Sequence, residues 1–247
     1  MKVLVCISKV PDTTTKIAFK DNNTKFNEEG VKYILNPTDE WYALVRGIEV
    51  KEKHGGSVTI VSVGDASYDT EMNKALAIGA DDAVRIDAVP TDAYFVAAQI
   101  AAYAKSENYD LVITGKETID YNGGIVGGLL AEMMDLPYVS LVTTMTLEGT
   151  KATLEREIEG GKEIVEVNTP FAMSANKGLA EQRIPNMRGI MMARKKPKKV
   201  LPPFEGIQPL TEIVSYEAVP PRSNVKLVEP DNVAELVRLL HEEAKVF

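Results

Sequence analysis

Short apolar runs that alternate with helix-forming segments constrain the fold of this chain more than any other feature. The runs occupy residues 2–7, 57–63, 83–86 and 109–114, and the segments between them predict helices over 37–53, 68–79 and 91–105. Strands that are apolar on both faces are typical of a parallel sheet covered by helices on either side. We therefore predict an α/β fold with a mostly parallel, doubly wound, Rossmann-like sheet.

The pattern changes after Pro137. Residues 142–149, 151–158 and 162–169 are rich in Thr, Val and Glu, and glycine-containing turns separate them. Such segments are typical of half-exposed antiparallel strands joined as hairpins. We predict an antiparallel hairpin region added to the parallel sheet, followed by one more apolar strand over 169–174.

The last fifty residues lack the periodicity of a core. Residues 195–230 are rich in proline, and an amphipathic helix capped by Asp231 is predicted after them. We expect a nucleotide-binding domain over 1–194 and an extended C-terminal arm over 195–247. The apolar face of the final helix needs a surface to rest on, either in this chain or in another subunit.

Composition excludes several classes of protein. The net charge of −8 argues against a nucleic-acid binder, and no apolar run approaches the roughly 20 residues that span a bilayer. The segment 1–7 is too short for a signal-peptide core, and Cys6 is the single cysteine, so no intrachain disulfide forms. We expect a cytoplasmic protein without direct membrane insertion.

Familiar catalytic motifs are missing. The chain lacks G-x-G-x-x-G after its first strand, the phosphate-binding G-x-x-x-x-G-K-[ST], and G-x-S-x-G. His54 and His241 lie in charged segments typical of exposed helix ends, and no metal-ligand spacing is present. We therefore predict no catalytic residue and no metal site.

The polar loop at 114–124 is the strongest candidate for a binding site. It follows an apolar strand and ends in Gly123-Gly124 before a predicted helix at 125–134, whose free amides could bind a phosphate. In an open parallel sheet, ligands bind beyond the carboxyl ends of the strands. Both a nucleotide site and a plain strand-to-helix turn fit this spacing.

Four segments together resemble the beta subunit of electron transfer flavoproteins. They are Val3–Asp12, with Lys-Val-Pro-Asp; Val31–Asp39, with Asn-Pro; the pair Ala75–Asp81 and Asp110–Asp120; and Arg156–Pro170 followed by Ile184–Lys195. Any one is weak, but the four occur in order and at fitting distances over nearly the whole chain.

The resemblance implies a heterodimer with an alpha subunit, which carries an FAD. That FAD moves electrons from flavin dehydrogenases to a quinone-linked acceptor, so the chain is expected to be an electron carrier subunit and not an enzyme. The beta subunit itself is expected to hold AMP, or a second FAD if the protein belongs to the bifurcating branch of the family.

By matching motifs, the nucleotide contacts are expected at the following residues: Cys6, Ser8, Lys9, Asn36, Pro37, Thr38, Asp39, Val63, Gly115, Lys116, Ile119, Asp120, Asn122, Gly123, Gly124, Ile125 and Val126. The family's loop usually continues as Gly-Asp and a polar stretch, where this chain has Tyr121-Asn122 and Gly123-Gly124-Ile125. Side-chain donors to a phosphate are thereby lost, and AMP and FAD both remain open.

Two residues are expected to contact partners. Glu157 matches an acidic position that pairs with an arginine of the mobile flavin domain. Leu179 matches the anchor of a recognition loop for flavin dehydrogenases, and an exposed leucine among polar neighbours suits that role. The alternative for Leu179 is a loop residue folded back onto its own core.

Two other functions remain open at this stage. One is a nucleotide hydrolase of similar fold, which would need a phosphate-gripping motif and a metal-binding acid. The other is a nucleotide-sensing module that works alone, without a partner for the arm.

Overall fold

The structure is a computed structural model of the chain, and it describes residues 1–221 and 225–247. The chain forms two compact units. The first comprises Met1–Lys16 and Asn27–Val214, and the second comprises Ile17–Phe26 and Ser215–Phe247.

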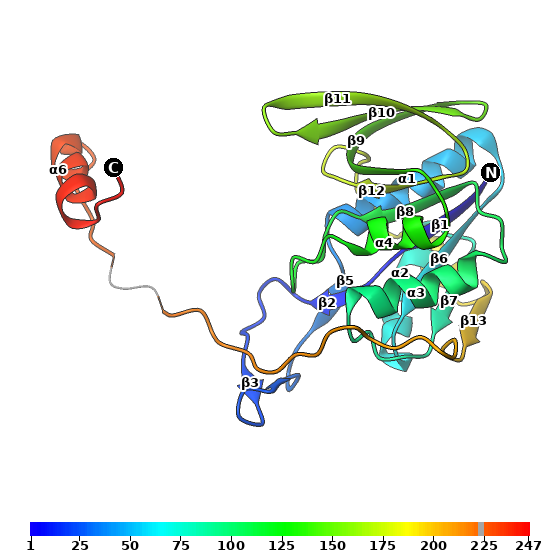
Figure 1. Cartoon of the computed structure of the whole chain (residues 1–247), viewed down its shortest axis with the longest axis horizontal. Coiled ribbons are helices and arrows are strands. Elements are labelled where there is room, and N and C mark those ends of the chain that lie inside the picture. Colours follow the sequence, from blue (N-terminus) through cyan, green and yellow to red (C-terminus); the bar gives the residue numbers. More distant parts are fainter. Residues whose placement is uncertain (222–224) are drawn as a thin grey trace. The chain divides into compact units, whose positions relative to one another are not determined.

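The first unit is built on one large, mostly parallel sheet (Figure 1). In the described part of the chain this sheet has nine strands in the order β11-β10-β9-β12-β8-β1-β6-β7-β13. The strands are β1 (Lys2–Cys6), β6 (Ser57–Val63), β7 (Asp82–Ile86), β8 (Leu111–Gly115), β9 (Tyr138–Glu148), β10 (Lys151–Ile158), β11 (Gly161–Asn168), β12 (Phe171–Ala175) and β13 (Lys198–Leu201). All neighbouring pairs are parallel except β9–β10 and β10–β11.

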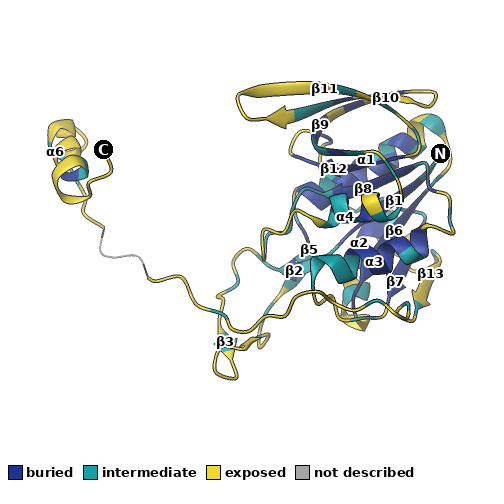
Figure 2. Cartoon of the chain, viewed as in Figure 1, coloured by how far each residue is buried: buried dark blue, intermediate teal, exposed yellow. Residues whose placement is uncertain are grey.

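Helices cover both faces of the sheet. They are α1 (Asp39–His54), the short 3₁₀ turn η1 (Ala66–Tyr68), α2 (Asp69–Ile78), α3 (Ala93–Ala104), α4 (Val126–Met133) and α5 (Met187–Ala193). Alternate residues of β1 point to opposite sides: Val3 and Val5 pack with α1 and α2, whereas Leu4 and Cys6 pack with α3 and α4. The strands accordingly lie in a buried central layer (Figure 2). The predicted doubly wound α/β fold is confirmed.

The antiparallel region also forms as predicted. β9, β10 and β11 pair in sequence order, and β9 joins the parallel part of the sheet through β12. Most of β11 and the tips of the hairpins are exposed (Figure 2), which agrees with the alternation of polar and apolar residues there.

The predicted domain boundary at residue 194 is too early. β13 (Lys198–Leu201) adds to the sheet beside β7. Further along, the carboxylate of Asp92 accepts hydrogen bonds from the backbone amides of Leu210 and Thr211, at 2.6 and 2.8 Å. Residues 195–214 therefore belong to the first unit, and the proline-rich composition concealed both interactions.

Two small antiparallel pairs lie outside the large sheet. In the first unit, β2 (Lys9–Pro11) pairs with β5 (Tyr33–Leu35). In the second, β3 (Phe19–Lys20) pairs with β4 (Lys25–Phe26), and the ring of Phe19 stacks on that of Tyr216 at 4.8 Å. The amide of Tyr216 also donates to the carbonyl of Asn23, so this hairpin holds the start of the arm.

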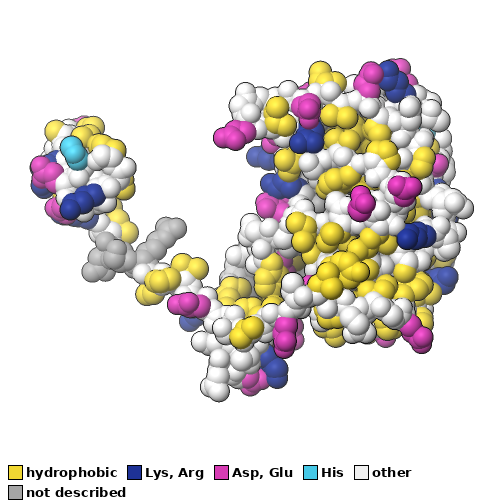
Figure 3. All heavy atoms as spheres, viewed as in Figure 1, with side chains coloured by type: hydrophobic (Ala, Val, Ile, Leu, Met, Phe, Trp, Pro, Cys, Tyr) yellow, Lys and Arg dark blue, Asp and Glu magenta, His cyan; other side chains and the backbone are white. Residues whose placement is uncertain are grey.

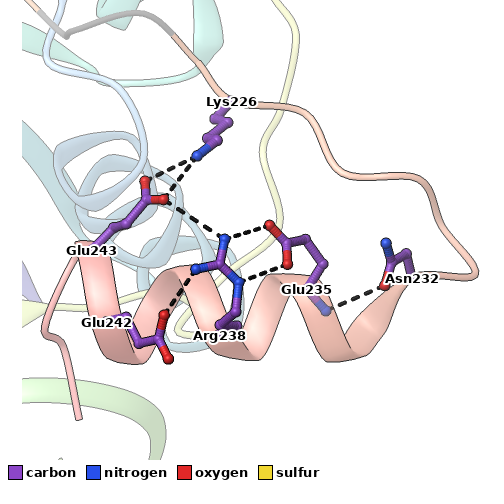
Figure 4. A network of polar contacts seen from close by, with 6 residues as sticks. All are labelled: Lys226, Asn232, Glu235, Arg238, Glu242 and Glu243. Atoms are coloured by element: carbon purple, nitrogen blue, oxygen red, sulfur yellow. Dashed lines mark hydrogen bonds and ion pairs between the residues drawn. The ribbon is translucent and has the colours of Figure 1, made fainter.

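The arm ends in the helix α6 (Val233–Arg238), continued by η2 (Leu239–Glu243). Its cap is Asn232 and not the predicted Asp231, because the Asn232 side chain accepts from the amide of Glu235. A charged network occupies one side of this helix (Figure 4), in which Arg238 pairs with Glu235 and Glu242 and Lys226 pairs with Glu243. Apolar side chains are exposed along the arm and on its helix (Figure 3), Val219 and Leu227 most of all.

In the described part of the chain, no helix combines the length and the apolar character needed to cross a membrane.

Phe171 tests the packing of the sheet. It is fully buried in β12, between β8 and β9, so Phe171→Ala is expected to lower the free energy of unfolding by about 3–5 kcal/mol. Urea denaturation measures this. Ile164→Ala, at a position 72% exposed, serves as the control and should change it by less than about 0.5 kcal/mol. A Phe171 variant as stable as this control would contradict the packing described.

Candidate functional site

The order of the strands reverses between β1 and β8, the position at which open α/β sheets form a ligand-binding crevice. After β1 the chain builds β6 and β7 on one side, then crosses to form β8 on the other side of β1. At such a reversal the loops from adjacent strands diverge, and the space beyond their carboxyl ends is where open α/β sheets bind ligands. The residues at this point are Cys6, which ends β1, and Gly115, which ends β8.

The first turn of α1 closes one side of the crevice and packs directly on the end of β8. A Cβ atom added at Gly115 would lie 2.7 Å from Cγ of Glu40 and 3.2 Å from its backbone nitrogen. Only glycine therefore permits this approach, and the glycine at the start of the loop has a packing reason in addition to any role toward a ligand.

Glu40 ties the loop after β1 to α1. Its carboxylate is 6% exposed and accepts from the backbone amide of Ser8 at 2.6 Å and from the Ser8 hydroxyl at 2.7 Å. Burial raises the pKa of Glu40 to about 8, although the Ser8 hydrogen bonds oppose that rise. The pKa of the Cys6 thiol is also raised, mainly by burial and to a lesser extent by the nearby Glu40.

Asn36 joins three loops at the same edge. Its amide nitrogen donates to the carbonyl of Glu117 at 2.9 Å, and its side-chain oxygen accepts from the amide of Ile119 at 3.1 Å. Its backbone amide donates to the carbonyl of Ser8. Asn36 is fully buried, so these bonds fix the positions of the 8–9 and 117–119 segments relative to each other.

The residues after Asn36 turn sharply into α1. Thr38 has φ 62° and ψ −94°, a conformation that β-branched residues rarely adopt. Strain of this kind persists only where the surroundings determine the backbone, and it gathers at binding sites. Asp39, the next residue, is 6% exposed, and desolvation raises the pKa of its carboxyl group.

The 116–125 loop follows β8 at this edge of the sheet, and its tip at residues 121–125 is exposed. Its start is fixed by a bond from the amide of Lys116 to the carbonyl of Ala175, and Lys116 pairs with Glu117 at 3.2 Å. Asn122 has φ 51°, and its amide donates to the carbonyl of Thr118. Gly123, Gly124 and Ile125 are exposed, so main-chain groups are accessible where the sequence lacks polar side chains.

The amino end of α4 supplies the clearest sign of a ligand. No side chain caps it at Ile125. A Cβ added at Gly127 would lie 2.6 Å from both the Thr114 hydroxyl oxygen and the Tyr138 phenol oxygen, so the helix approaches these groups closely. Thr114 is 4% exposed, and in the described residues its hydroxyl oxygen has no hydrogen-bond partner. A buried polar atom without a partner beside an uncapped helix amino end fits an anionic group.

Lys9 and Val63 lie toward β6. The ammonium of Lys9 donates to the Ser67 hydroxyl at 2.5 Å and lies 4.0 Å from the centre of the Tyr33 ring and 5.0 Å from that of Tyr68. Val63 ends β6 next to Gly64, which packs against the Tyr68 ring. Glu40 and Asn36 thus bring Ser8, Gly115 and Ile119 together. Cys6 and Asp39 lie at the same edge, and Lys9 and Val63 lie toward β6.

Sequence reasoning missed three residues of this region. Glu40 reads as an ordinary acid in the first turn of a helix, and nothing in the sequence marks its burial. Thr114 is recognisable only as the residue where a strand ends and the 114–124 loop begins, without its buried hydroxyl, and Tyr68 reads as part of a helix start. The signal in the sequence that points to Glu40 has two parts. An Asn-Pro turn precedes its helix, and a glycine, Gly115, ends another strand at the same edge of the sheet.

The expectation that Leu179 is exposed is wrong. Leu179 is fully buried in the main core, and the Arg46 guanidinium donates to its carbonyl oxygen, with Nε at 3.0 Å. The segment continues along α1, where Trp41 Nε1 donates to the carbonyl of Arg183 and Arg183 pairs with Glu52. These contacts hold the loop against the core of its own domain, which was the alternative interpretation of Leu179.

Glu157 is exposed, and its carboxylate accepts from the Asn176 side chain at 2.8 Å. Its pairing with a partner's arginine stays a prediction.

Comparison with known proteins places this chain in a family. The Electron transfer flavoprotein domain matches residues 23–203. The chain is 36% identical over its whole length to the electron transfer flavoprotein subunit beta of Bacillus subtilis, which it covers completely. The chain belongs to the electron transfer flavoprotein beta subunit family.

Other relatives agree over similar lengths. The human electron transfer flavoprotein subunit beta is 31% identical over the whole chain, with 99% of that protein covered. The subunit beta of Thermoanaerobacterium thermosaccharolyticum is 38% identical over 81% of this chain and 78% of its own length. The matches to the Bacillus subtilis and human proteins extend through the C-terminal arm.

The burial of Glu40 predicts a pH effect on stability. The pKa of Glu40 is about 8 in the folded chain and is ordinarily 4.5. Between pH 4.5 and about pH 8 the folded state binds a proton that the unfolded state lacks. The contribution of protonated Glu40 to the free energy of unfolding is therefore fully present below the lower pKa and is lost as the pH rises through the higher one. Relative to Glu40→Gln, which mimics the protonated acid, the wild type should lose up to about 1.4 kcal/mol per pH unit in this window.

Urea midpoints of both proteins across this pH range measure the effect. Glu29→Gln, at an exposed carboxylate, is the control and should follow the wild type. Parallel pH profiles for the wild type and Glu40→Gln would show that Glu40 ionises as freely in the folded chain as in the unfolded one.

Proposed function

We propose that this chain is the subunit of a two-subunit electron transfer flavoprotein that holds an adenine nucleotide, AMP or FAD, in the crevice between β1 and β8. The observation that carries the proposal is the unpartnered Thr114 hydroxyl beside the uncapped end of α4. A nucleotide phosphate supplies the negative charge and the hydrogen-bond acceptors that this position lacks.

The surrounding residues fit the rest of a nucleotide. The amides at Gly123 to Val126 would face the phosphate without competing side chains, which suits a loop that has lost its polar residues. Asn36, Pro37, Thr38 and Asp39 would line the crevice from the α1 side, and Cys6, Ser8, Lys9 and Val63 from the β1 and β6 side. Lys116, Ile119, Asp120 and Asn122 would cover it from the β8 loop. Neutral or buried carboxyl groups, as at Glu40, reduce repulsion toward the phosphate.

Electron transfer is assigned to FAD held mainly by an alpha subunit, and FAD supplies reversible acceptance of one or two electrons when bound. This chain's own residues would position, shield and orient the cofactors, and the electron transfer requires no acid or base from the protein. The electrons would come from flavin dehydrogenases and pass to a quinone-linked acceptor. The cytoplasm is the compartment that fits a chain whose single cysteine is buried and free.

The C-terminal arm is the part of this chain that we assign to binding the alpha subunit. Its apolar side chains are exposed in this chain, among them Val219 at 90% and Leu227 at 89%, and such a stretch is typical of a surface that another protein covers. Glu157 would meet the mobile flavin domain.

The surface for flavin dehydrogenases is assigned to the segment after Arg183 in place of Leu179. Ile184 is 88% exposed and Met187 is 74% exposed, and both follow directly on the part of the loop that is held to α1. An apolar side chain that projects from a fixed base suits insertion into a partner's pocket.

Co-expression with an electron transfer flavoprotein alpha subunit tests the proposal. A yellow complex is expected, with one adenine nucleotide per heterodimer released from this chain on denaturation in addition to the FAD of the alpha subunit. A colourless chain that purifies alone and empty would overturn it, and turnover of ATP with magnesium by the isolated chain would favour a hydrolase.

Thr114→Val separates the binding role from a structural one. Loss of one hydrogen bond to the phosphate is expected to weaken AMP binding about threefold to tenfold in calorimetry of the nucleotide-stripped complex. The urea midpoint should stay the same or rise, because the variant removes a buried hydroxyl that has no partner.

Thr143→Val is the matched control. The Thr143 hydroxyl is also buried, but it donates to the carbonyl of Glu155. This variant should lose stability and keep its AMP affinity. If Thr114→Val behaved like Thr143→Val in both measurements, Thr114 would not contact the nucleotide.

A further inference from the structure

The exposed methionines of the described residues are concentrated on one short helix. The chain has nine methionines. Those with large exposure are Met187 at 74%, Met191 at 68% and Met192 at 49%, all in α5. Met72, Met145 and Met173 are instead buried in the main core.

The packing of α5 explains why these side chains point outward. Gly189 lies so close to α2 that a Cβ there would be 2.3 Å from the carbonyl oxygen of Ala77, and Ala193, one turn later, is 3% exposed. Positions 189 and 193 therefore face α2, since residues four apart share a helix face. Met187 and Met191, also four apart, are left on an outer face.

Positive charge surrounds this group. Arg188, Arg194 and Lys195 are exposed, and none of them takes part in an ion pair within the described part of the chain. Ile184 and Ile190 extend the apolar surface, at 88% and 41% exposed. The patch, defined by Ile184, Met187, Ile190, Met191 and Met192, is apolar with a basic rim, and it matches a partner with an apolar pocket and an acidic border.

We propose that Met187, Met191 and Met192 are a site of reversible methionine oxidation, and that their conversion to sulfoxides switches off docking at this patch. The oxidant is hydrogen peroxide. One peroxide oxygen is transferred to the thioether sulfur, which is oxidised by two electrons, and the peroxide is reduced to water. A sulfoxide is polar, so its formation removes apolar character from a surface that depends on it.

The site of modification follows from exposure alone, whereas the effect on docking rests on the proposed function. The two can fail separately. Peptide mapping of the oxidised protein needs no dehydrogenase and no bound nucleotide, so it decides the first part even if the chain proves to have another role.

Limited treatment of the purified protein with hydrogen peroxide, followed by mass spectrometry of its peptides, tests the site. Met187, Met191 and Met192 are expected to oxidise on the order of tenfold faster than Met72, Met145 and Met173, because the buried sulfurs react only after local opening. Equal rates for the two groups would overturn the proposal.

The apolar probe bis-ANS measures the consequence. Its fluorescence with the complex should fall after peroxide treatment and return after treatment with the methionine sulfoxide reductases MsrA and MsrB. A variant with Met187→Leu, Met191→Leu and Met192→Leu keeps the apolar surface and cannot form sulfoxides, so its signal should resist peroxide. A signal that falls equally in this variant would show that the lost surface lies elsewhere and would contradict the proposal.

Discussion

The close contact between the first turn of α1 and the end of β8 organises the rest of this structure. Gly115 permits that contact, and Glu40 converts it into a fixed crevice by binding both the amide and the hydroxyl of Ser8. Asn36 then attaches the 117–119 loop to the same base. A buried carboxyl group that accepts hydrogen bonds from two donors is costly to disturb, so this edge of the sheet is held in shape before any ligand arrives.

The same helix also supports the segment that leads to the apolar patch. While its first turn builds the crevice, Trp41, Arg46 and Glu52 further along α1 hold the segment that leads to Ile184. Helix α1 thus positions the candidate nucleotide site and the segment that leads to the apolar patch, while α5 of the patch packs on α2. This arrangement suits the proposed function, in which the chain holds a cofactor and a partner in fixed places.

The sequence predicted the parts of the fold that depend on local periodicity. The apolar runs of β1, β6 and β8 and the helical segments between them were recognisable, as were the hairpin turns at Gly149 and Gly160. It failed where distant segments decide the outcome. β13 is a basic, proline-flanked stretch that becomes a strand only because β7 offers a free edge, and Leu179 is buried only because α1 binds its loop. The glycines of the candidate site were visible in the sequence, whereas the burial of Glu40 and Thr114 depends on the tertiary packing and was not.

The central claim is that the amino end of α4 and the Thr114 hydroxyl hold a phosphate. The most direct test compares AMP with adenosine by titration calorimetry on the complex after its nucleotide has been removed. Charge-assisted hydrogen bonds to a phosphate predict that AMP binds about 100-fold more tightly than adenosine. Equal affinities for the two would show that the crevice recognises the base and sugar alone, and would contradict the account.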